Sequence, residues 1–327
     1  MVMKTNDASL SCDQPCREIL FLDPACTHNI WGGNRLREEF GYPVEGDDIG
    51  ECWGISAHPN GESTVRCGRF AGQKLSEVWR EHPEIFGSPD SEEFPLLTKI
   101  IDARDNLSIQ VHPDDAYAKE HENGASGKTE SWYILDCPED ARLVIGHNAM
   151  TREELAAMIH EGRWWELIRE IPVKKGDFLQ IDPGTVHAIK GGILLLEIQQ
   201  SSDITYRVYD YDRLSDGKPR KLHVQQSIDV ITVPAKPVTE VVTPLPEIKE
   251  NQLQTLYSGA YYRVFRMYVN GMAHFGQEDS FLCVSVVEGS GIVSGQPVKK
   301  GDHFILPHGF GEVQLQGQMQ IIASAAL

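Results

Sequence analysis

Gln110 and His112 are the first pair of residues whose types and spacing could bind a metal ion. They lie two positions apart in the strand-like segment NLSIQVHPDDAYA (106–118). Alternation along a strand would place both side chains on one face, with Ile109 and Val111 on the other. A solvated polar face has the same pattern, so this segment alone leaves both interpretations open.

Glu130 and His187 are two further candidate ligands from separate strand-like segments. Glu130 precedes the apolar run in GKTESWYIL, and His187 follows the turn in PGTVHAI. Imidazole nitrogens with a carboxylate oxygen suit Zn²⁺ at about 2.0–2.2 Å, whereas an all-oxygen set would favour Ca²⁺ or Mg²⁺. A neutral glutamine ligand leaves more positive charge on the metal than a second carboxylate would. The predicted ligands are Gln110, His112, Glu130 and His187.

Several charged residues in apolar surroundings would suit an anionic substrate beside such a metal. Lys99 lies in PLLTKII, Lys128 precedes Glu130 by two residues, and Arg207 lies in SSDITYRVYDYDR. A salt bridge or extension to solvent is the commoner role of Lys and Arg, and it stays the alternative for each. Glu197 stands within LLLEI, where burial would raise its pKa toward values useful for proton transfer unless Arg207 lowers it.

The elements that position these residues are mainly strands. Short apolar or alternating runs separated by Gly, Pro and Asp predict a mainly β fold. Two segments, 74–87 and 151–172, have a helical period instead, and the second opens with Thr151 and Glu154 at the spacing of a capping box. The stretch 232–248 holds four prolines and predicts an extended linker.

A weak internal repeat predicts two related β-barrels. VKKGDFLQIDPGTVH begins at Val173 and VKKGDHFILPHGFGE at Val298, an offset of 298 − 173 = 125 residues. Each copy has a Gly-Asp turn, then an apolar strand, then a second turn, as tight barrel corners require. The residue equivalent to His187 is Glu312, so we expect the second unit to have lost any metal site.

Composition excludes several classes of protein. The 327 residues include 30 Lys and Arg against 48 Asp and Glu, a net charge of −18, which is too acidic for a general binder of nucleic acid or anionic membranes. No apolar run approaches the ~20 residues of a membrane helix, and the N-terminus is too polar for a secretory signal. These features predict a cytoplasmic protein, and the seven scattered cysteines are expected to be free thiols.

Several long motifs resemble the type I mannose-6-phosphate isomerases in their short bacterial form. The most specific are FPLLTKIIDARDNLSIQVHPDDAYA, GKTESWYIL, PGTVHAI and LLEIQQSSDITYRVYDYDR. WGGNRL and IGECWGIS resemble that family's N-terminal segments, so the similarity covers residues 18–325. It implies two cupin-type (jelly-roll) β-barrels with a few helices added to the first. The expected parts are a polar arm (1–17), a metal-binding catalytic domain (18–235), and a linker with a metal-free cupin-like barrel (236–327).

The resemblance implies an isomerase that interconverts mannose 6-phosphate and fructose 6-phosphate through an enediol, with one zinc ion per chain held by the four residues above. The family's active-site arginine and glutamate match Arg207 and Glu197, and Lys128 is an alternative proton-transfer group. Lys99 and Ser108 match pocket residues, and Arg213 stands where longer members carry a lysine. These three residues are predicted to bind the phosphate or the hydroxyls of the substrate.

Two rival classes stay open from the sequence. One is a non-catalytic, metal-retaining cupin that binds a sugar or sugar phosphate, and the other is an iron oxygenase, which usually has more histidine ligands. The predicted partner is a sugar phosphate, with no nucleic acid and no membrane, and the chain could be a monomer or a homodimer. The basic residues should form a positive pocket on a negative molecule.

Overall fold

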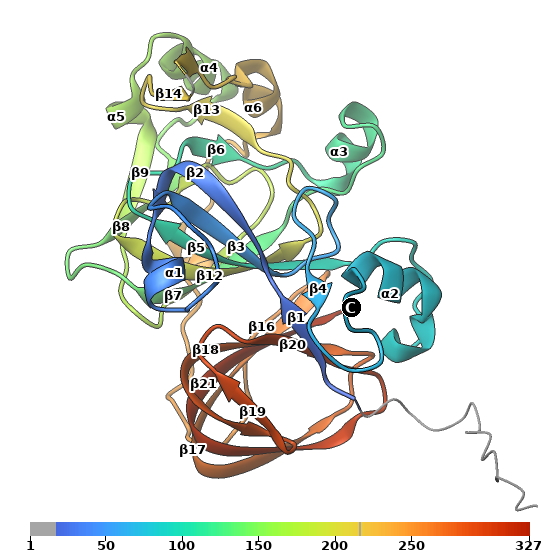
Figure 1. The fold of residues 1–327 in the computed structure, drawn as a ribbon. Coiled ribbons are helices and arrows are strands. Elements are labelled where there is room, and N and C mark those ends of the chain that lie inside the picture. The colour runs from blue at the N-terminus through green and yellow to red at the C-terminus, as the bar shows by residue number, and fades with distance from the viewer. Residues whose placement is uncertain (1–17, 216) are drawn as a thin grey trace, which may run out of the picture.

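The computed structural model describes residues 18–215 and 217–327, so the predicted arm 1–17 lies outside the described part. Its strands form three large sheets and one hairpin, β14 (Leu214–Ser215) with β15 (Lys218–Pro219) (Figure 1). The mainly β fold is therefore confirmed. None of the described helices combines the length and the apolar character needed to cross a bilayer.

The central sheet has six strands in the order β10-β7-β12-β5-β2-β3. These are β2 (Ala25–Gly33), β3 (Ile49–Ile55), β5 (Leu96–Ala103), β7 (Glu130–Asp136), β10 (Phe178–Ile181) and β12 (Ile193–Gln200). Alternation on β7 sends Trp132 and Ile134 to one face and Tyr133 and Leu135 to the other. The sheet is thus buried on both faces and separates two hydrophobic cores, which explains why β5 and β12 read as nearly continuous apolar runs.

The second sheet faces the inner side of the central one and has five strands in the order β13-β6-β11-β8-β9. They are β6 (Ile109–Val111), β8 (Arg142–His147), β9 (Ile168–Pro172), β11 (His187–Ala188) and β13 (Tyr206–Tyr209). Its outer face is covered by α4 (Arg152–His160), α5 (Trp164–Leu167) and α6 (Val224–Val230) (Figure 1). Ile109 and Val111 pack outward in that core, so Gln110 between them points inward, as predicted.

The third sheet carries eight strands and contains most of the C-terminal unit. They are β1 (Leu20–Asp23), β4 (Thr64–Val65), β16 (Gln254–Ser258), β17 (Tyr262–Gln277), β18 (Leu282–Val293), β19 (Gln296–Lys299), β20 (His303–Leu306) and β21 (Gly311–Ala326). β1 pairs with β20, with Leu20 opposite Ile305, so an N-terminal strand completes the C-terminal sheet. The domain limits remain a prediction, and the described sheets are open along their hydrogen-bonded order.

The helical predictions are correct in part. Segment 74–87 forms α2 (Leu75–Glu81) and a 3₁₀ turn, Pro83–Phe86, that ends at Gly87 with φ 80°. In segment 151–172, Thr151 Oγ accepts a hydrogen bond from the Glu154 amide at 3.2 Å. The segment forms two helices, α4 and α5, and the helical prediction is wrong after Leu167. Residues 168–172 form β9, because pairing with β8 prevails over the helical period.

Three short helices complete the described elements. They are α1 (Arg35–Glu38), α3 (Asp115–His121) and α7 (Val238–Val241). The last lies in the segment predicted as an extended linker, and the prediction is wrong at this turn because buried Val241 joins the inner core.

The repeat corresponds to one local structure in two places. The Lys174 amide donates to Asp177 Oδ2 at 2.9 Å, and the Lys299 amide donates to Asp302 Oδ2 at 2.8 Å. The glycine inside each turn has a positive φ, 88° for Gly176 and 91° for the second copy, which a side chain would strain. In both copies the aspartate closes the turn that starts the next strand.

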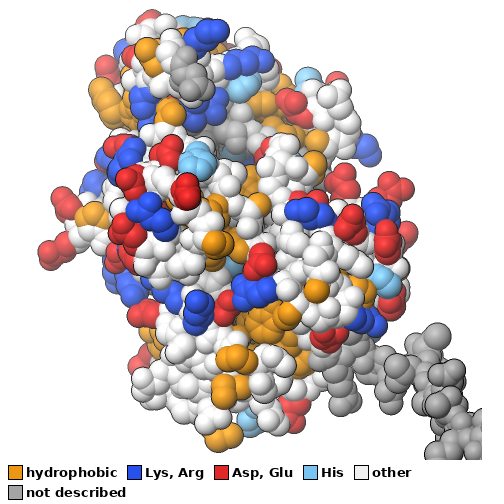
Figure 2. Space-filling view, in the orientation of Figure 1, with side chains coloured by type: hydrophobic (Ala, Val, Ile, Leu, Met, Phe, Trp, Pro, Cys, Tyr) orange, Lys and Arg blue, Asp and Glu red, His pale blue; other side chains and the backbone are white. Residues whose placement is uncertain are grey.

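The C-terminal unit carries few charged side chains on the face in Figure 2, whereas acids and bases are interspersed above it. This agrees with the sequence, in which residues 251–327 contain only five acids and four bases.

An aromatic cluster joins this unit to the α2 region. Phe281 lies with its ring centroid 5.4 Å from those of Phe86 and Phe94, and 5.9 Å from that of Trp79. We expect Phe281→Ala to lower the free energy of unfolding by about 3–5 kcal/mol through lost burial and a cavity. Urea denaturation would measure this. Met272→Ala, at a residue that is 76% exposed, should change it by less than about 0.5 kcal/mol, and equal effects would contradict the argument.

Candidate metal centre and active site

His112, Glu130 and His187 converge between the two inner sheet faces. Their potential ligand atoms all lie within 4.8 Å of one another, and all three residues are buried. Glu130 Oε2 is 3.3 Å from His112 Nε2, and Glu130 Oε1 is 3.4 Å from His187 Nε2. This burial excludes the solvated-face interpretation of the β6 segment.

Both imidazoles are oriented by backbone carbonyls. His112 Nδ1 lies 2.7 Å from the Ile204 oxygen, and His187 Nδ1 lies 2.9 Å from the Thr185 oxygen. A carbonyl can only accept, so each Nδ1 carries the proton and each Nε2 presents a lone pair to Glu130. This is the arrangement that metal-ligating histidines usually have.

Burial lowers the pKa of His112 to about 3, and the positive charge of Lys128 adds to this effect. Burial also lowers the pKa of His187. For Glu130, burial opposes ionisation, but the nearby positive charge of Lys128 holds its pKa well below the ordinary value. At neutral pH the cluster therefore holds two neutral imidazoles and one carboxylate, the protonation state that a metal requires.

Gln110 completes the predicted set, because β6 pairs with β11 in the register Gln110 opposite His187. Its amide nitrogen lies 3.2 Å from His187 Nε2. Neither oxygen of Glu130 receives a directed hydrogen bond from the described residues, although Lys128 Nζ lies 2.7 Å from Oε2. A buried carboxylate whose Oε1 has no donor, two imidazole lone pairs and an amide fit a divalent cation such as Zn²⁺.

A cavity of about 160 Å³ opens beside the ligand cluster, lined by Gln110 and five of the other predicted residues: Lys99, Ser108, Lys128, Glu197 and Arg207. Strand pairing sets Glu197 opposite both Lys99 and Trp132. The Trp132 indole N–H donates to Glu197 Oε2 at 3.0 Å, while Oε1 lies 3.7 Å from Lys99 Nζ and 3.9 Å from Lys128 Nζ. Burial raises the pKa of Glu197, and the charge of Glu130 raises it further.

The lysines and arginines of the cavity differ in their partners. Lys128 pairs with Glu130, and Lys99 lies between Glu197 and Glu51 and over the Trp53 ring. Arg207 has no such carboxylate among the described residues. Its Nη1 donates to the Lys221 carbonyl at 2.9 Å, and its buried Nε has no partner there. The positive end of the cavity is therefore the end lined by Arg207 and Arg220, called the arginine end below.

Arg213, predicted to bind substrate, does not line this cavity. Its guanidinium is held by Asp210 at 2.6 Å and by the carbonyl of Asn106. The structure instead brings Arg220, Glu51 and Trp53 into the lining, and the sequence analysis singled out none of these three. The IGECWGIS motif contains Glu51 and Trp53 and could have indicated them. Arg220 lies in a polar loop with no such signal.

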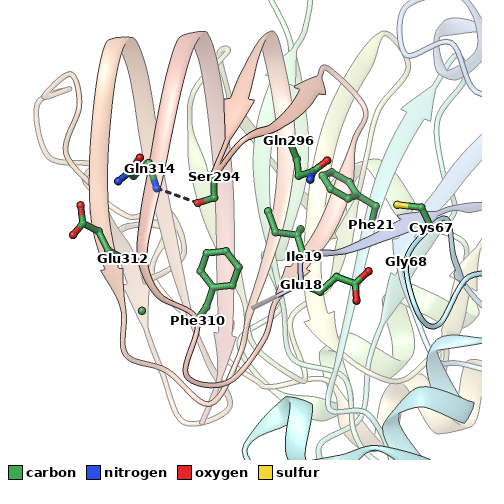
Figure 3. A pocket seen from close by; sticks show the side chains of 11 residues that line it. Glu18, Ile19, Phe21, Cys67, Gly68, Ser294, Gln296, Phe310, Glu312 and Gln314 are labelled. Carbon is green, nitrogen blue, oxygen red and sulfur yellow. Dashed lines mark hydrogen bonds between the residues drawn. The ribbon is translucent and has the colours of Figure 1, made fainter. Parts of the chain in front are cut away.

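A second cavity, of about 720 Å³, lies in the C-terminal unit (Figure 3). Its lining includes Phe21, Phe310 and Glu312, the residue equivalent to His187, and no histidine. In the part of the chain that the structure describes, His112, Glu130 and His187 form the one cluster of at least three potential His, Cys or carboxylate ligands. That the second unit lacks a metal site stays a prediction.

The fold and site together define a cupin-type protein with one candidate metal centre. Residues 19–137 match the model of the phosphomannose isomerase type I catalytic domain, and residues 252–326 match the mannose-6-phosphate isomerase cupin domain. The chain is 49% identical to mannose-6-phosphate isomerase ManA of Bacillus subtilis over 94% of this chain and 98% of the relative. It belongs to the type I phosphomannose isomerase family and is an isomerase of that family.

Solved structures agree with this assignment. A crystal structure of the mannose 6-phosphate isomerase from Bacillus subtilis matches with a TM-score of 0.87 and 45% identity, covering 94% of this chain and 99% of that one. A zinc-bound mannose 6-phosphate isomerase matches with a TM-score of 0.76 at 15% identity, covering 94% and 99%, which shows a shared fold.

Proposed function

We propose that this chain is a zinc-dependent isomerase that interconverts mannose 6-phosphate and fructose 6-phosphate through an enediol. The observation that carries the proposal is the buried carboxylate of Glu197 in the cavity that Gln110 also lines, beside the buried cluster of His112, Glu130 and His187. A binding protein has no need for an acid with a raised pKa at this place. Zinc, when bound, supplies Lewis-acid stabilisation of negative charge on the substrate oxygens.

Glu197 is the proposed proton-transfer group. Aldose–ketose isomerisation removes a proton from the carbon next to the carbonyl and returns it to the neighbouring carbon. The Trp132 indole holds one oxygen of Glu197, which leaves Oε1 free to take and return that proton. Lys128, the alternative group, is buried and paired with Glu130, and the carboxylates outweigh the effect of burial and raise its pKa. It is thereby better suited to hold charge than to exchange a proton.

The other predicted residues have supporting roles in this proposal. Arg207 adds positive charge beside Gln110, its register partner on β6. Lys99 and Ser108 are proposed to hold sugar hydroxyls, since both are buried and line the cavity. Arg213 shares Asp210 with Arg220 and is proposed to act through that carboxylate.

The test is a coupled assay for fructose 6-phosphate on the purified protein, together with elemental analysis. Turnover of mannose 6-phosphate with about one zinc per chain would support the proposal. Metal without turnover would favour a metal-retaining sugar-binding cupin, and iron in place of zinc would favour an oxygenase.

Removal of the metal should abolish turnover reversibly. After incubation with a chelator and desalting, we expect activity to fall to the background of the assay and to return on addition of one equivalent of Zn²⁺. The fold should survive, because three sheets and four hydrophobic cores do not depend on the site. Far-UV circular dichroism would check this. Full activity of a metal-free sample would contradict the proposal.

A further inference from the structure

The arginine end of the cavity carries an unassigned residue, Arg220, in the loop after β15. Arg220 Nε donates to Asp210 Oδ2 at 2.7 Å, and Nη2 donates to Oδ1 at 2.5 Å. Asp210 is buried, and its two hydrogen bonds fix the plane of the Arg220 guanidinium. No partner for Nη1 occurs among the described residues, and Arg220 lines the cavity. The Nε–Nη2 edge of the Arg220 guanidinium is therefore bound to Asp210, and Nη1 is available to a ligand.

Arg207 lies beside Arg220 and strengthens the positive charge at this end. Burial lowers the pKa of Arg207, and the charge of Arg220 is close enough to lower it further. Asp210 binds Arg220 and Arg213, while Asp203, which also lines the cavity, contacts Asn60 and His58. Neither carboxylate forms an ion pair with Arg207 among the described residues, so this end of the cavity keeps an excess of positive charge. A dianion would relieve the mutual repulsion of Arg207 and Arg220.

The cavity therefore has two chemically distinct ends. At the inner end, Lys99 and Lys128 are neutralised by Glu51, Glu130 and Glu197. At the other end, Arg220 shares Asp210 with Arg213, and Arg207 has no ion pair among the described residues. In a hexose 6-phosphate the reacting carbons and the phosphoryl group also stand at opposite ends of the molecule, so the charge pattern of the cavity matches that of the substrate.

We infer that Arg220, pre-positioned by Asp210 and next to Arg207, binds the phosphoryl group of the substrate. This inference rests on the proposed function, and it assigns phosphate recognition to Arg220 in place of Arg213. Planar guanidinium donors bind phosphate oxygens with better geometry than a lysine ammonium does. The short-form enzyme would thus bind the phosphate through the loop that follows the β14–β15 hairpin.

The test compares Arg220→Gln with Lys221→Gln, which removes one positive charge from an exposed neighbour in the same loop. We expect Arg220→Gln to raise KM for mannose 6-phosphate by roughly tenfold to a hundredfold, as loss of a charged hydrogen bond predicts, with a smaller change in kcat. Unphosphorylated mannose, used as a poor alternative substrate, should be converted with nearly unchanged kcat/KM. Arg220→Lys should be intermediate, and it serves as the second variant if the glutamine form folds poorly.

A binding measurement separates this inference from the proposed function. Inorganic phosphate should raise the melting temperature of the wild-type holoenzyme and of Lys221→Gln, and this shift should disappear in Arg220→Gln. If the wild type forms no fructose 6-phosphate, the proposed function fails, while the phosphate shift still tests the arginine. If the wild type is active but Arg213→Gln, and not Arg220→Gln, loses the phosphate shift and raises KM, the inference is overturned.

Discussion

His112→Ala is expected to remove the metal and to lower kcat/KM by on the order of 10³-fold or more, equivalent to about 4 kcal/mol of transition-state stabilisation. The reason lies in the geometry of the cluster. His112 Nε2 is 3.3 Å from Glu130, and its Nδ1 donates to the Ile204 carbonyl, so the alanine variant loses one of the two imidazole ligands of the cluster. Metal content after dialysis and initial rates in the coupled assay would measure both effects.

The matched control is His147→Asn. His147 is also buried, but its Nε2 lies 2.9 Å from the Thr232 carbonyl and it is outside the ligand cluster. This variant should keep its zinc and most of its activity after any loss of stability is accounted for by its melting temperature. Retention of both zinc and full activity in His112→Ala would refute the metal centre.

Glu197→Gln should lower kcat by roughly 10²–10⁴-fold, the range of general acid–base catalysis, while zinc content and KM change little. The amide keeps the size of the side chain and can still accept from the Trp132 indole, but it cannot take a proton. Glu51→Gln is the comparison, since Glu51 lines the same cavity and also contacts Lys99. We expect it to lose less than about tenfold, and a larger loss there would transfer the proton-shuttling role to Glu51.

The pH profile gives an independent check on Glu197. A base acts when it is deprotonated, and burial together with the charge of Glu130 raises the pKa of Glu197 above that of a free glutamate. Activity should therefore fall on acidification at a higher pH than an exposed glutamate would give. In Glu197→Gln this acidic limb should be absent from the residual rate. An unchanged limb would assign it to another group.

Local sequence patterns were sufficient to place Gln110 and His112 on the inner face of β6, and the physical reason is the strand period; that these residues bind a metal stays a prediction. Gln110 and His112 share a face, and Ile109 and Val111 pack on the other, as alternation requires. The repeat correctly indicated two turns of the same kind at Asp177 and Asp302. Such features depend on neighbours in sequence, which a single chain displays directly.

Features that depend on distant neighbours could not be predicted in this way. The helical period of 151–172 gave no sign that its last residues would pair with β8. The guanidiniums of Arg213 and Arg220 both donate to the Asp210 carboxylate. Arg213 also donates to the Asn106 carbonyl, so the two arginines have different partners. The expected positive pocket is wrong in part. Lys99 and Lys128 are neutralised by carboxylates and Arg213 lies outside the cavity lining, so Arg207 is the predicted base that lines the cavity with no ion pair among the described residues.

The pairing of β1 with β20 has a consequence for how the molecule is made. Leu20 lies opposite Ile305, so contacting residues are 305 − 20 = 285 positions apart in the chain. On the ribosome, the first strand must wait until nearly all of the protein has emerged before it finds its partner. Contacts this distant slow folding, and they leave the edge of β20 open to other chains in the meantime. The C-terminal sheet therefore reaches its final form only after β20 has emerged, whereas the strands of the two site-bearing sheets all precede residue 210.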